Sequence, residues 1–315
     1  MTALSTTATP WTFFDTEVVA VVPLGASFAR LTLRGADLGH VADNGLDQRF
    51  KMLFPAPSGG FEHLRREADW YGAWRALPEE HRCPIRTYTV RAVRPDAAGP
   101  GGELDVDMVR HGAAGPASAF AETAQVGDRV VVLGPDARFD GEHGGVEFRP
   151  PPSHRGPFLL AGDETALPAV AVILEQLRPD AFGEVVLEVP ESADRLDLRR
   201  PEGMAVTWVV RDGASYGSGL AREVPAAVER LELPLAVAGQ DLDESPADLA
   251  GADEVLWDVP EEAAADVVAR SLYAWLAGEA AAITGLRRHL VREVGVDRRA
   301  VAFMGYWRAG RAAAS

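Results

Sequence analysis

The residues at 86–91, Arg-Thr-Tyr-Thr-Val-Arg, combine side chains that a bound cofactor would need. Their β-branched and aromatic character predicts a strand over 86–93. Because side chains alternate along a strand, Arg86 and Tyr88 share one face while Thr89 lies on the other. A tyrosine ring can stack on a flat ring system, and an arginine fork can bind a pyrophosphate. An ordinary strand with exposed arginines is the competing interpretation of the same pattern.

A second segment, at 105–118, changes from strand-like to helix-like residues through a Gly-Ala-Ala-Gly-Pro turn. We expect a strand over 103–109, then this turn, then a helix that begins near Ala117. Glycines allow the backbone to approach a phosphate, and the free N–H groups of a helix N-terminus bind anions. Since Arg-x-Tyr-Thr also matches the signature of flavin-binding strands, the two segments together predict a flavin with a diphosphate. His111 is either a neighbour of that flavin or a satisfied histidine at a strand end.

A third segment, Leu-Leu-Ala-Gly-Asp-Glu-Thr-Ala-Leu-Pro-Ala at 159–169, predicts a strand, a tight turn and a helix start. A dinucleotide-binding fold places its ligand at such a turn. The segment resembles a Gly-x-Gly-x-x-Pro turn in which the second glycine is lost. Asp163, Glu164 and Thr165 either contact a cofactor or cap the helix. The paired carboxylates suggest acid–base catalysis, but hydride transfer does not need it.

Short strands separated by Gly, Pro or Asp make up most of the first half of the chain. This pattern favours an antiparallel barrel or sandwich. Apolar residues three or four apart at 62–77 predict a helical insertion. We expect strands over 13–22, 28–33, 49–54, 86–93, 103–109 and 129–133.

Three consecutive prolines in 149–157 cannot continue a helix and predict an extended linker between two domains. Beyond it, strands alternate with helices, which favours a parallel sheet covered on both faces. The predicted architecture is an antiparallel β-barrel domain, 11–150, followed by a doubly wound α/β domain, 157–311. In the second domain we expect strands over 158–161, 184–189, 205–210 and 300–307, helices over 166–177 and 218–231, helical or mixed structure over 263–276 and 280–294, and short strands or loops over 235–238 and 254–259.

Composition narrows the class of protein. The net charge of the 315 residues is 31 − 47 = −16, which argues against nucleic acid or an anionic membrane as a partner. No apolar run approaches the ~18 residues of a membrane span, and the N-terminus lacks the pattern of a secretory signal. The single cysteine, Cys83, excludes an internal disulfide and a cysteine-rich metal site, so a reducing cytoplasm is the expected compartment. The seven histidines form no cluster with metal-ligand spacing, so no protein metal site is expected.

Taken together, the motifs resemble those of the siderophore-interacting proteins, a family of flavin-dependent ferric-siderophore reductases. The most specific are Gly-Asp-Glu-Thr-Ala-Leu-Pro-Ala at 162–169 and Gly-Tyr-Trp-Arg-Ala-Gly at 305–310. Trp-Leu-Ala-Gly-Glu-Ala at 275–280 and Leu-Arg-Arg at 286–288 agree with them, so the resemblance covers about 13–311. The chain departs from the family pattern at 155–157, where Arg-Gly-Pro replaces a tryptophan, and it diverges over 235–259.

The resemblance implies a fold of the ferredoxin-reductase type, with FAD held on the barrel and NADH or NADPH approaching the second domain. FAD would take a hydride and pass single electrons to Fe(III) in a siderophore, so no amino acid needs to act as a catalytic group. The residues that the resemblance assigns to cofactor binding are Arg86, Thr87, Tyr88, Thr89, Asp107, Val109, His111, Gly112, Gly115, Ala117, Ser118, Asp163, Glu164, Thr165 and Trp307.

The family binds an anionic ferric chelate in a basic pocket, and the best matches for that role are Lys51 and Arg138. Lys51 is the only lysine of the chain, although a plain surface lysine is the alternative. Glu188 is placed to bind a ribose hydroxyl, whereas Arg195 and Arg211 would suit a 2′-phosphate, so the choice between NADH and NADPH stays open. Two other functions remain possible for the chain: a flavin reductase that serves ferredoxin, and a non-catalytic flavin- or siderophore-binding module.

Overall fold

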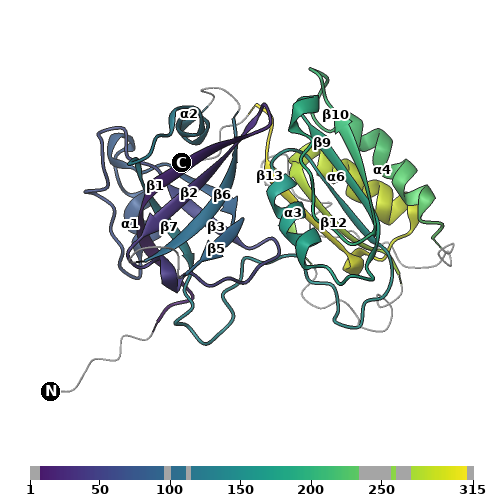
Figure 1. Cartoon of the computed structure of the whole chain (residues 1–315), viewed down its shortest axis with the longest axis horizontal. Helices are drawn as coiled ribbons and strands as arrows, with labels where there is room; N and C mark the ends of the chain where they lie inside the picture. The colour runs from purple at the N-terminus through teal and green to yellow at the C-terminus, as the bar shows by residue number, and fades with distance from the viewer. Residues whose placement is uncertain (1–7, 96–100, 111–114, 234–256, 260–270, 311–315) are drawn as a thin grey trace. The chain divides into compact units, whose positions relative to one another are not determined.

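The computed structural model describes residues 8–95, 101–110, 115–233, 257–259 and 271–310. The chain forms two compact units, of which the first ends at Val146 and the second begins at Glu147 (Figure 1). None of the helices in the described ranges is long and apolar enough to cross a membrane.

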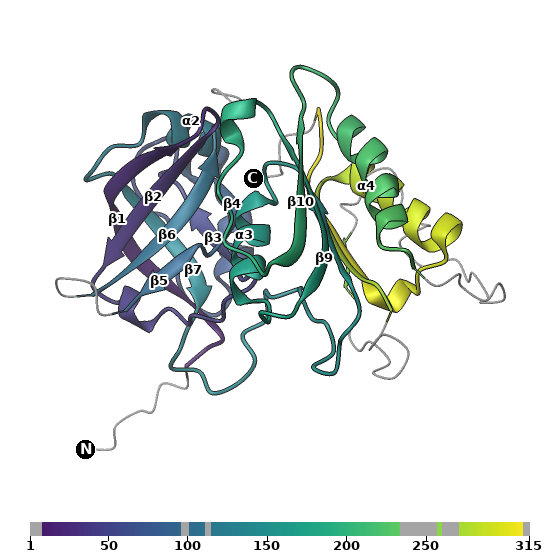
Figure 2. The same ribbon diagram turned by 45° about the vertical axis from the view of Figure 1, so that its right-hand side comes forward.

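The first unit is built on one antiparallel sheet of seven strands, in the order β4-β3-β7-β1-β2-β6-β5 (Figure 2). Strand β4 pairs with β3, and β5 pairs with β6, although only Val90 and Arg91 separate β4 from β5. One short segment therefore joins both ends of the sheet and curls it into the predicted antiparallel barrel. The strands are β1 (Trp11–Leu24), β2 (Phe28–Gly35), β3 (Arg49–Leu53), β4 (Ile85–Thr89), β5 (Ala92–Arg94), β6 (Gly102–Val109) and β7 (Arg129–Pro135).

Alternation of apolar and polar residues explains how these strands form a barrel. On β2, Leu31 and Leu33 are fully buried, while the intervening Thr32 is half-buried on the opposite face. The inward side chains of β6 follow the same rule and meet them in one core. Further members of this core are Phe14, Val18, Phe50, Met52, Leu104, Val106, Met108, Val130 and Val132.

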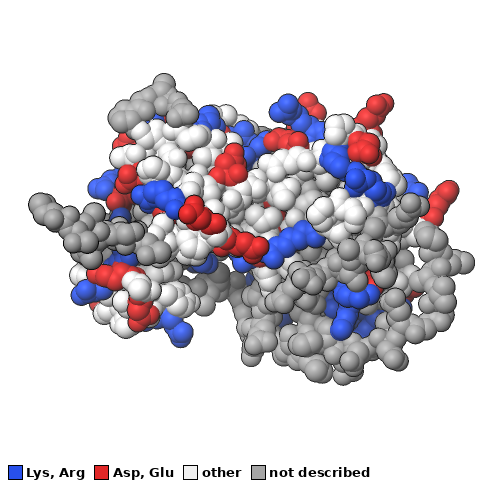
Figure 3. All heavy atoms as spheres, turned by 90° about the horizontal axis from the view of Figure 1, so that it is seen from below, with Lys and Arg blue, Asp and Glu red and all other residues white. Residues whose placement is uncertain are grey.

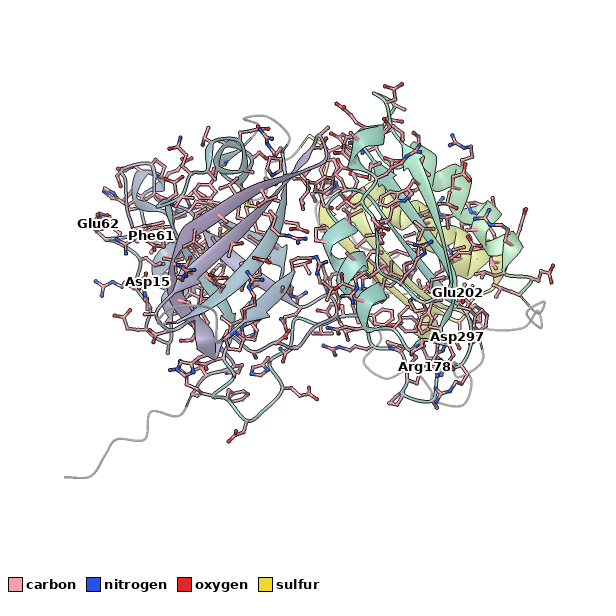
Figure 4. The ribbon with its side chains drawn as sticks, viewed as in Figure 1. Asp15, Phe61, Glu62, Arg178, Glu202 and Asp297 are labelled. Carbon is pink, nitrogen blue, oxygen red and sulfur yellow. The ribbon has the colours of Figure 1, made fainter. Side chains whose placement is uncertain are left out.

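The helical insertion is much shorter than the sequence predicts. Instead of a helix over 62–77, the structure has only α1 (Trp70–Arg75). The Nη1 and Nη2 atoms of Arg66 donate to the carboxylate of Asp15 on β1, at 2.8 and 2.7 Å. This ion pair holds the residues before α1 against the outer surface of the barrel. Figure 4 shows Asp15, Phe61 and Glu62 on the same flank of the unit. The apolar residues of the insertion therefore cover the outer face of the sheet instead of forming one continuous helix.

The second unit contains a six-stranded sheet in the order β10-β9-β8-β12-β13-β11, in which β11 alone among the described strands runs antiparallel. Helices α4 and α6 pack on one face, and α3 lies on the other, which confirms the doubly wound prediction (Figure 2). The elements are β8 (Phe158–Gly162), α3 (Leu167–Gln176), β9 (Phe182–Val189), β10 (Gly203–Val210), α4 (Ser218–Arg230), β11 (Trp257–Asp258), β12 (Tyr273–Glu279), α6 (Ala280–Arg288), a π-helical turn at His289–Val294 and β13 (Val301–Trp307).

Strand β12 differs from the sequence prediction. Helical or mixed structure was expected over 263–276, but residues 273–276 begin a strand in the middle of the sheet. All residues of β12 are buried. A strand that is covered on both faces has no alternation of polar and apolar residues, so its pattern does not distinguish it from a buried helix. Residues 235–238 and 263–270 lie outside the described part of the chain.

The proline-rich segment at 149–157 packs on the second unit and is not a free linker. The ring of Phe148 lies 5.8 Å from that of Phe158 and 5.4 Å from that of Tyr273. The backbone N–H of Arg149 donates to the Tyr273 hydroxyl at 2.9 Å. Within this segment Pro151 and His154 are buried, and the His154 ring lies 4.6 Å from that of Phe158.

Gly278 on β12 provides a test of this packing. Its φ of 146° is a conformation that side-chain-bearing residues rarely adopt, and an added Cβ would lie 2.6 Å from an oxygen of Asp163. We expect Gly278→Ala to lower the free energy of unfolding by about 2–4 kcal/mol. Gly285→Ala is the matched control, because Gly285 lies on the exposed surface of α6 with open space around it. Alanine at this helical position should raise the free energy of unfolding by as much as ~1 kcal/mol. Chemical denaturation measures both, and equal stability of the two variants would contradict the packing.

Candidate functional site

Arg86 and Tyr88 lie on the same face of β4, as predicted. They stand opposite Met52 and Phe50 of β3, whose side chains belong to the barrel core, and the Tyr88 ring lies 6.4 Å from that of Phe50. Burial raises the pKa of the Tyr88 hydroxyl, which therefore stays protonated at neutral pH. The side chain of Tyr88 is half-buried and leaves part of the ring open to a ligand.

The Arg86 guanidinium has no acidic partner within the described residues. Its Nη1 donates to the backbone carbonyl of Ile85 at 2.8 Å, and burial lowers its pKa. A half-buried cation without a carboxylate is an unfavourable arrangement that an anion relieves. Arg86 is therefore available to a diphosphate.

Lys51 occupies the opposite face of the same strand pair. Its ammonium lies 3.4 Å from the hydroxyl of Thr87, the residue directly across from it on β4. Burial and then repulsion by Arg49 lower the pKa of Lys51, and no carboxylate lies within ion-pair distance in the described part of the chain. Thr89 lies on this face too and is buried opposite Arg49. An anion bound near Lys51 would offset both effects on its pKa.

Arg138, the other predicted substrate residue, is already paired. Its guanidinium donates twice to the Asp136 carboxylate, at 2.8 and 2.7 Å, and its backbone N–H donates to the same group at 3.0 Å. Asp136 is buried, so removing Arg138 from it would leave a buried charge unpaired. Of the two predicted substrate residues, Lys51 is the one whose charge is available.

Asp107 on β6 forms part of an ion-pair ladder on the outer face of the barrel. Arg30 donates to it at 2.7 and 2.8 Å, and Arg91, just after β4, approaches it at 3.7 Å. The ladder continues to Asp105, which accepts from Arg94 at 2.7 Å. Basic and acidic side chains also lie side by side on the surface seen in Figure 3. Asp107 thus joins the two predicted flavin segments through Arg91, while Val109 ends β6 half-buried.

The N-terminus of α2 (Pro116–Thr123) fits a diphosphate. No side chain caps the helix, and Pro116 occupies its first turn. A Cβ built on Gly115 would meet no atom of the described residues within 4 Å. Ala117 is buried and Ser118 half-buried, and their N–H groups belong to the first turn, where a helix binds anions. His111 and Gly112, the remaining predicted residues of this segment, lie outside the described residues.

In the second unit, the Asp163 carboxylate joins the ends of three strands. It follows β8 and accepts the N–H and hydroxyl of Thr165 at 2.9 and 2.5 Å, the N–H of Glu279 on β12 at 2.7 Å, and the indole N–H of Trp307 on β13 at 2.8 Å. Gly278 provides the space that this close approach requires. The structure thus brings the predicted Asp163, Thr165 and Trp307 together at the carboxyl edge of the sheet.

Glu164 and Glu188 hold the same guanidinium. Arg211, at the end of β10, donates to Glu164 at 2.8 and 2.7 Å and to Glu188 at 3.3 Å. The guanidinium also lies 4.2 Å from the centre of the Tyr216 ring. Glu279 caps α6 by accepting the N–H groups of Ala281 and Ala282, and it reaches Ala309 as well. The carboxyl edge of this sheet is therefore strongly acidic.

Sequence reasoning missed Tyr216 and Glu279. Glu279 caps α6, but glutamate is not among the residues preferred at an N-cap, so the sequence contains no capping signal for it. Tyr216 carries no such signal, because its importance comes from neighbours that are distant in the sequence. The sequence analysis named Arg211 and Glu188 as competing ligand contacts, and the structure instead pairs them with each other.

Two family models match the chain. The model described as Siderophore-interacting protein matches residues 156–310, and that of the Siderophore-interacting FAD-binding domain matches residues 17–139. Ferric vibriobactin reductase ViuB of Vibrio cholerae is 30% identical over 285 residues, which cover 90% of this chain and 84% of that protein. The chain belongs to the siderophore-interacting protein family.

Solved structures of siderophore-interacting proteins agree with this assignment. A siderophore utilization protein from T. fusca has a TM-score of 0.66 at 28% identity and covers 96% of this chain and 95% of its own. SipS from Aeromonas hydrophila has a TM-score of 0.63 at 26% identity, with 96% and 93% covered. The fold of this siderophore-interacting protein is ferredoxin-reductase-like. The segment that matches the FAD-binding domain model, residues 17–139, contains β4 with Arg86, the N-terminus of α2 and Lys51.

The titration of Asp163 gives a test of the acidic edge. Burial, and then the Glu164 carboxylate, raise the pKa of Asp163 to about 6, while the bonds from Thr165 and Trp307 oppose the rise. The folded protein therefore binds a proton between about pH 4 and 6 that the unfolded chain does not, so stability from this group is present below pH 4 and is lost as the pH rises through 6. We expect the stability of the wild type relative to Asp163→Asn to fall by about 2–3 kcal/mol over that range.

Asp297→Asn is the control for this pH experiment. The hydrogen bond from Arg299 lowers the pKa of Asp297, so its contribution has the opposite sign and is lost as the pH falls. Denaturant unfolding at several pH values measures both differences. A wild-type advantage over Asp163→Asn that is constant from pH 4 to 7 would contradict the raised pKa.

Proposed function

We propose that this protein is an FAD-dependent reductase that accepts electrons from NADH or NADPH and reduces Fe(III) bound in a siderophore. The observation that carries the proposal is the pairing of Lys51 with Thr87 across β3 and β4. It places an ammonium without a carboxylate partner, among the described residues, one strand away from the Arg-Thr-Tyr-Thr motif. An anion bound by Lys51 would thus face Thr87 of the proposed flavin motif, on the side of the strand pair opposite Arg86 and Tyr88. The similarity to a ferric vibriobactin reductase supports the same substrate class.

The residues of the first unit divide the work of binding FAD. Arg86 binds the diphosphate with its unpaired guanidinium, and the open first turn of α2 binds it with backbone N–H groups. Tyr88 offers its half-buried ring to the flavin and keeps its hydroxyl protonated. FAD, when bound, accepts a hydride and releases electrons one at a time.

Lys51 attracts and orients the ferric chelate. The protein carries a net charge of −16, so an anionic substrate is repelled at long range unless the pocket is locally positive. Lys51 supplies that positive charge, since no acid within the described residues offsets the lowering of its pKa by burial and by Arg49. Fe(II) binds oxygen chelators more weakly than Fe(III), so reduction releases the iron.

The single cysteine favours a reducing compartment, and we place the activity in the cytoplasm.

An anaerobic experiment with two half-reactions tests this function. The purified protein, loaded with FAD, should lose its yellow absorbance when NADH or NADPH is added, and a ferric siderophore should restore it. Reoxidation by ferredoxin but not by ferric siderophores would indicate a reductase for a protein acceptor. A flavin that neither dinucleotide reduces would indicate a different electron donor or a binding module, and would overturn the proposed activity.

The role of Lys51 has a specific kinetic signature. We expect Lys51→Glu to lower kcat/KM for an anionic ferric siderophore by about tenfold to a hundredfold at low salt, because a charge is reversed within ~6 Å of the substrate. The defect should shrink as ionic strength rises, while flavin content and reduction by NAD(P)H stay normal.

Arg65→Glu is the matched control for this substitution. Arg65 is exposed on the insertion, outside the β3–β4 pair, and its replacement changes the net charge by the same amount. If both variants lose the same factor, the effect comes from net charge and Lys51 is not in the pocket. An unchanged kcat/KM in Lys51→Glu would make it a plain surface lysine.

A further inference from the structure

Among the described residues, Arg211 is the one arginine at the ends of β8, β9 and β10 that lies close to an exposed aromatic ring. Two carboxylates outweigh its single positive charge. Its side chain is 7% exposed, and the side chains of its partners Glu164 and Glu188 are 0% exposed. Two carboxylates share one guanidinium, so the group has a formal charge of −1. Asp163 directly precedes Glu164 in the sequence, and it adds a further negative charge when the pH is above its pKa of about 6.

The pairing of Arg211 is held rigidly. Glu188 also accepts the N–H groups of Gly217, Gly219 and Leu220, at 2.9, 3.0 and 3.3 Å, so it is fixed to the start of α4. Gly217 has a φ of 74°, and a Cβ there would lie 2.2 Å from the Cβ of Ala282. Rotation of Arg211 toward a ligand would leave Glu164 buried without its partner, which is costly. Arg211 is therefore unavailable to a phosphate.

Tyr216 provides an exposed aromatic ring beside the Arg211 guanidinium, on which a flat ring could stack. The side chain is 42% exposed, its ring lies over the Arg211 guanidinium, and the Trp307 ring meets it edge-on at 4.6 Å. Trp307 is fixed in turn by its bond to Asp163. An exposed, rigid aromatic ring at the carboxyl edge of a doubly wound sheet is well suited to stack on a nucleotide base.

The neighbouring turn does not supply positive charge either. Arg195 is exposed, but Glu191, Asp194 and Asp197 surround it in the sequence. Glu191 and Asp194 form a reciprocal capping box at this turn, so both carboxylates stay close to Arg195. A 2′-phosphate would thus meet more acids than bases at both turns.

We propose that the second unit stacks the adenine ring of the electron donor on Tyr216 and selects NADH over NADPH. The inference rests on the proposed function, since it names the donor of the same reductase. Selection arises because Arg211 is committed to Glu164 and Glu188, so a 2′-phosphate gains no ion pair from Arg211 and is repelled by the remaining negative charge of this group. The preferred donor is therefore the dinucleotide with a free ribose hydroxyl.

Binding and kinetics test this selection separately. Isothermal titration with AMP and with adenosine 2′,5′-bisphosphate reports on the second unit without any redox step. We expect AMP to bind at least tenfold more tightly, and anaerobic flavin reduction to show at least the same ratio of kcat/KM in favour of NADH. Tyr216→Leu should weaken AMP binding about tenfold, and Tyr216→Phe should retain it.

Glu164→Gln tests the role of Arg211 directly. Neutralising one carboxylate should raise affinity for the 2′,5′-bisphosphate roughly tenfold, the factor for one unit charge about 8 Å from a phosphate oxygen at an effective dielectric of about 30. The affinity for AMP, which lacks the 2′-phosphate, should rise by a smaller factor. Glu184→Gln is the matched control. Glu184 lies at the other end of β9 in an ion pair with Arg230, so its loss should change neither ligand.

The outcomes separate this inference from the proposed function. Equal or tighter binding of the 2′,5′-bisphosphate by the wild type, or no measurable binding of either nucleotide, overturns the selection and the platform. If Glu164→Gln does not fold, the wild-type ratio and the Tyr216 variants still decide. If AMP binds as expected but neither dinucleotide reduces the flavin, the proposed reductase activity fails while the adenosine site stands.

Discussion

A charge removed from water must be paired, and this constraint determines which side chains of the protein are available to ligands. Asp107 is buried and takes Arg30 and Arg91, while Glu164 and Glu188 take Arg211. Those arginines are structural, however suitable their position looks in the sequence. Lys51 and Arg86 are the exceptions, because burial disfavours their charged forms and no acid in the described residues compensates. An anionic ligand would supply the negative charge that is missing beside these two side chains.

The closure of the barrel explains why both of these cations belong to one strand pair. Strand β4 ends at Thr89, and the chain then crosses to β6 through Arg91, whose N–H donates to the Asp105 carbonyl at 2.9 Å. The flavin motif is thereby held on two sides, because β4 pairs with β3 and Arg91, just after β4, bonds to β6. Such a strand cannot fray as an ordinary edge strand does. Its alternation then sends Arg86 and Tyr88 to one face and Lys51, across from Thr87, to the other.

The sequence predicted those parts of the protein in which chemistry and periodicity are local. The alternating strands of the barrel, the turn before α2 and the turn at 162–165 are all legible from neighbouring residues. Strand β12 was not, because burial on both faces erases the alternation, and the insertion was not, because the bond from Arg66 to Asp15 joins residues far apart in the chain. The same limit applies to the site. Arg211 was recognised as a possible phosphate ligand, but its two carboxylate partners depend on the order of β8, β9 and β10 in the sheet.

The two units differ in the sign of the charged groups that their ion pairs leave over. In the first unit, cations remain after the ion pairs are made, and the groups that would bind them are phosphates or an anionic chelate. In the second unit, carboxylates remain, and the groups that bind them are backbone N–H donors: Glu279 caps α6, Glu188 caps α4, and Asp163 ties β12 to β8. These acids therefore stabilise the carboxyl edge from within, although the ligand proposed for this edge itself carries phosphates. A dinucleotide bound there would gain affinity from ring stacking more than from charge, so the proposed site depends on the exposed ring of Tyr216 and not on the paired Arg211.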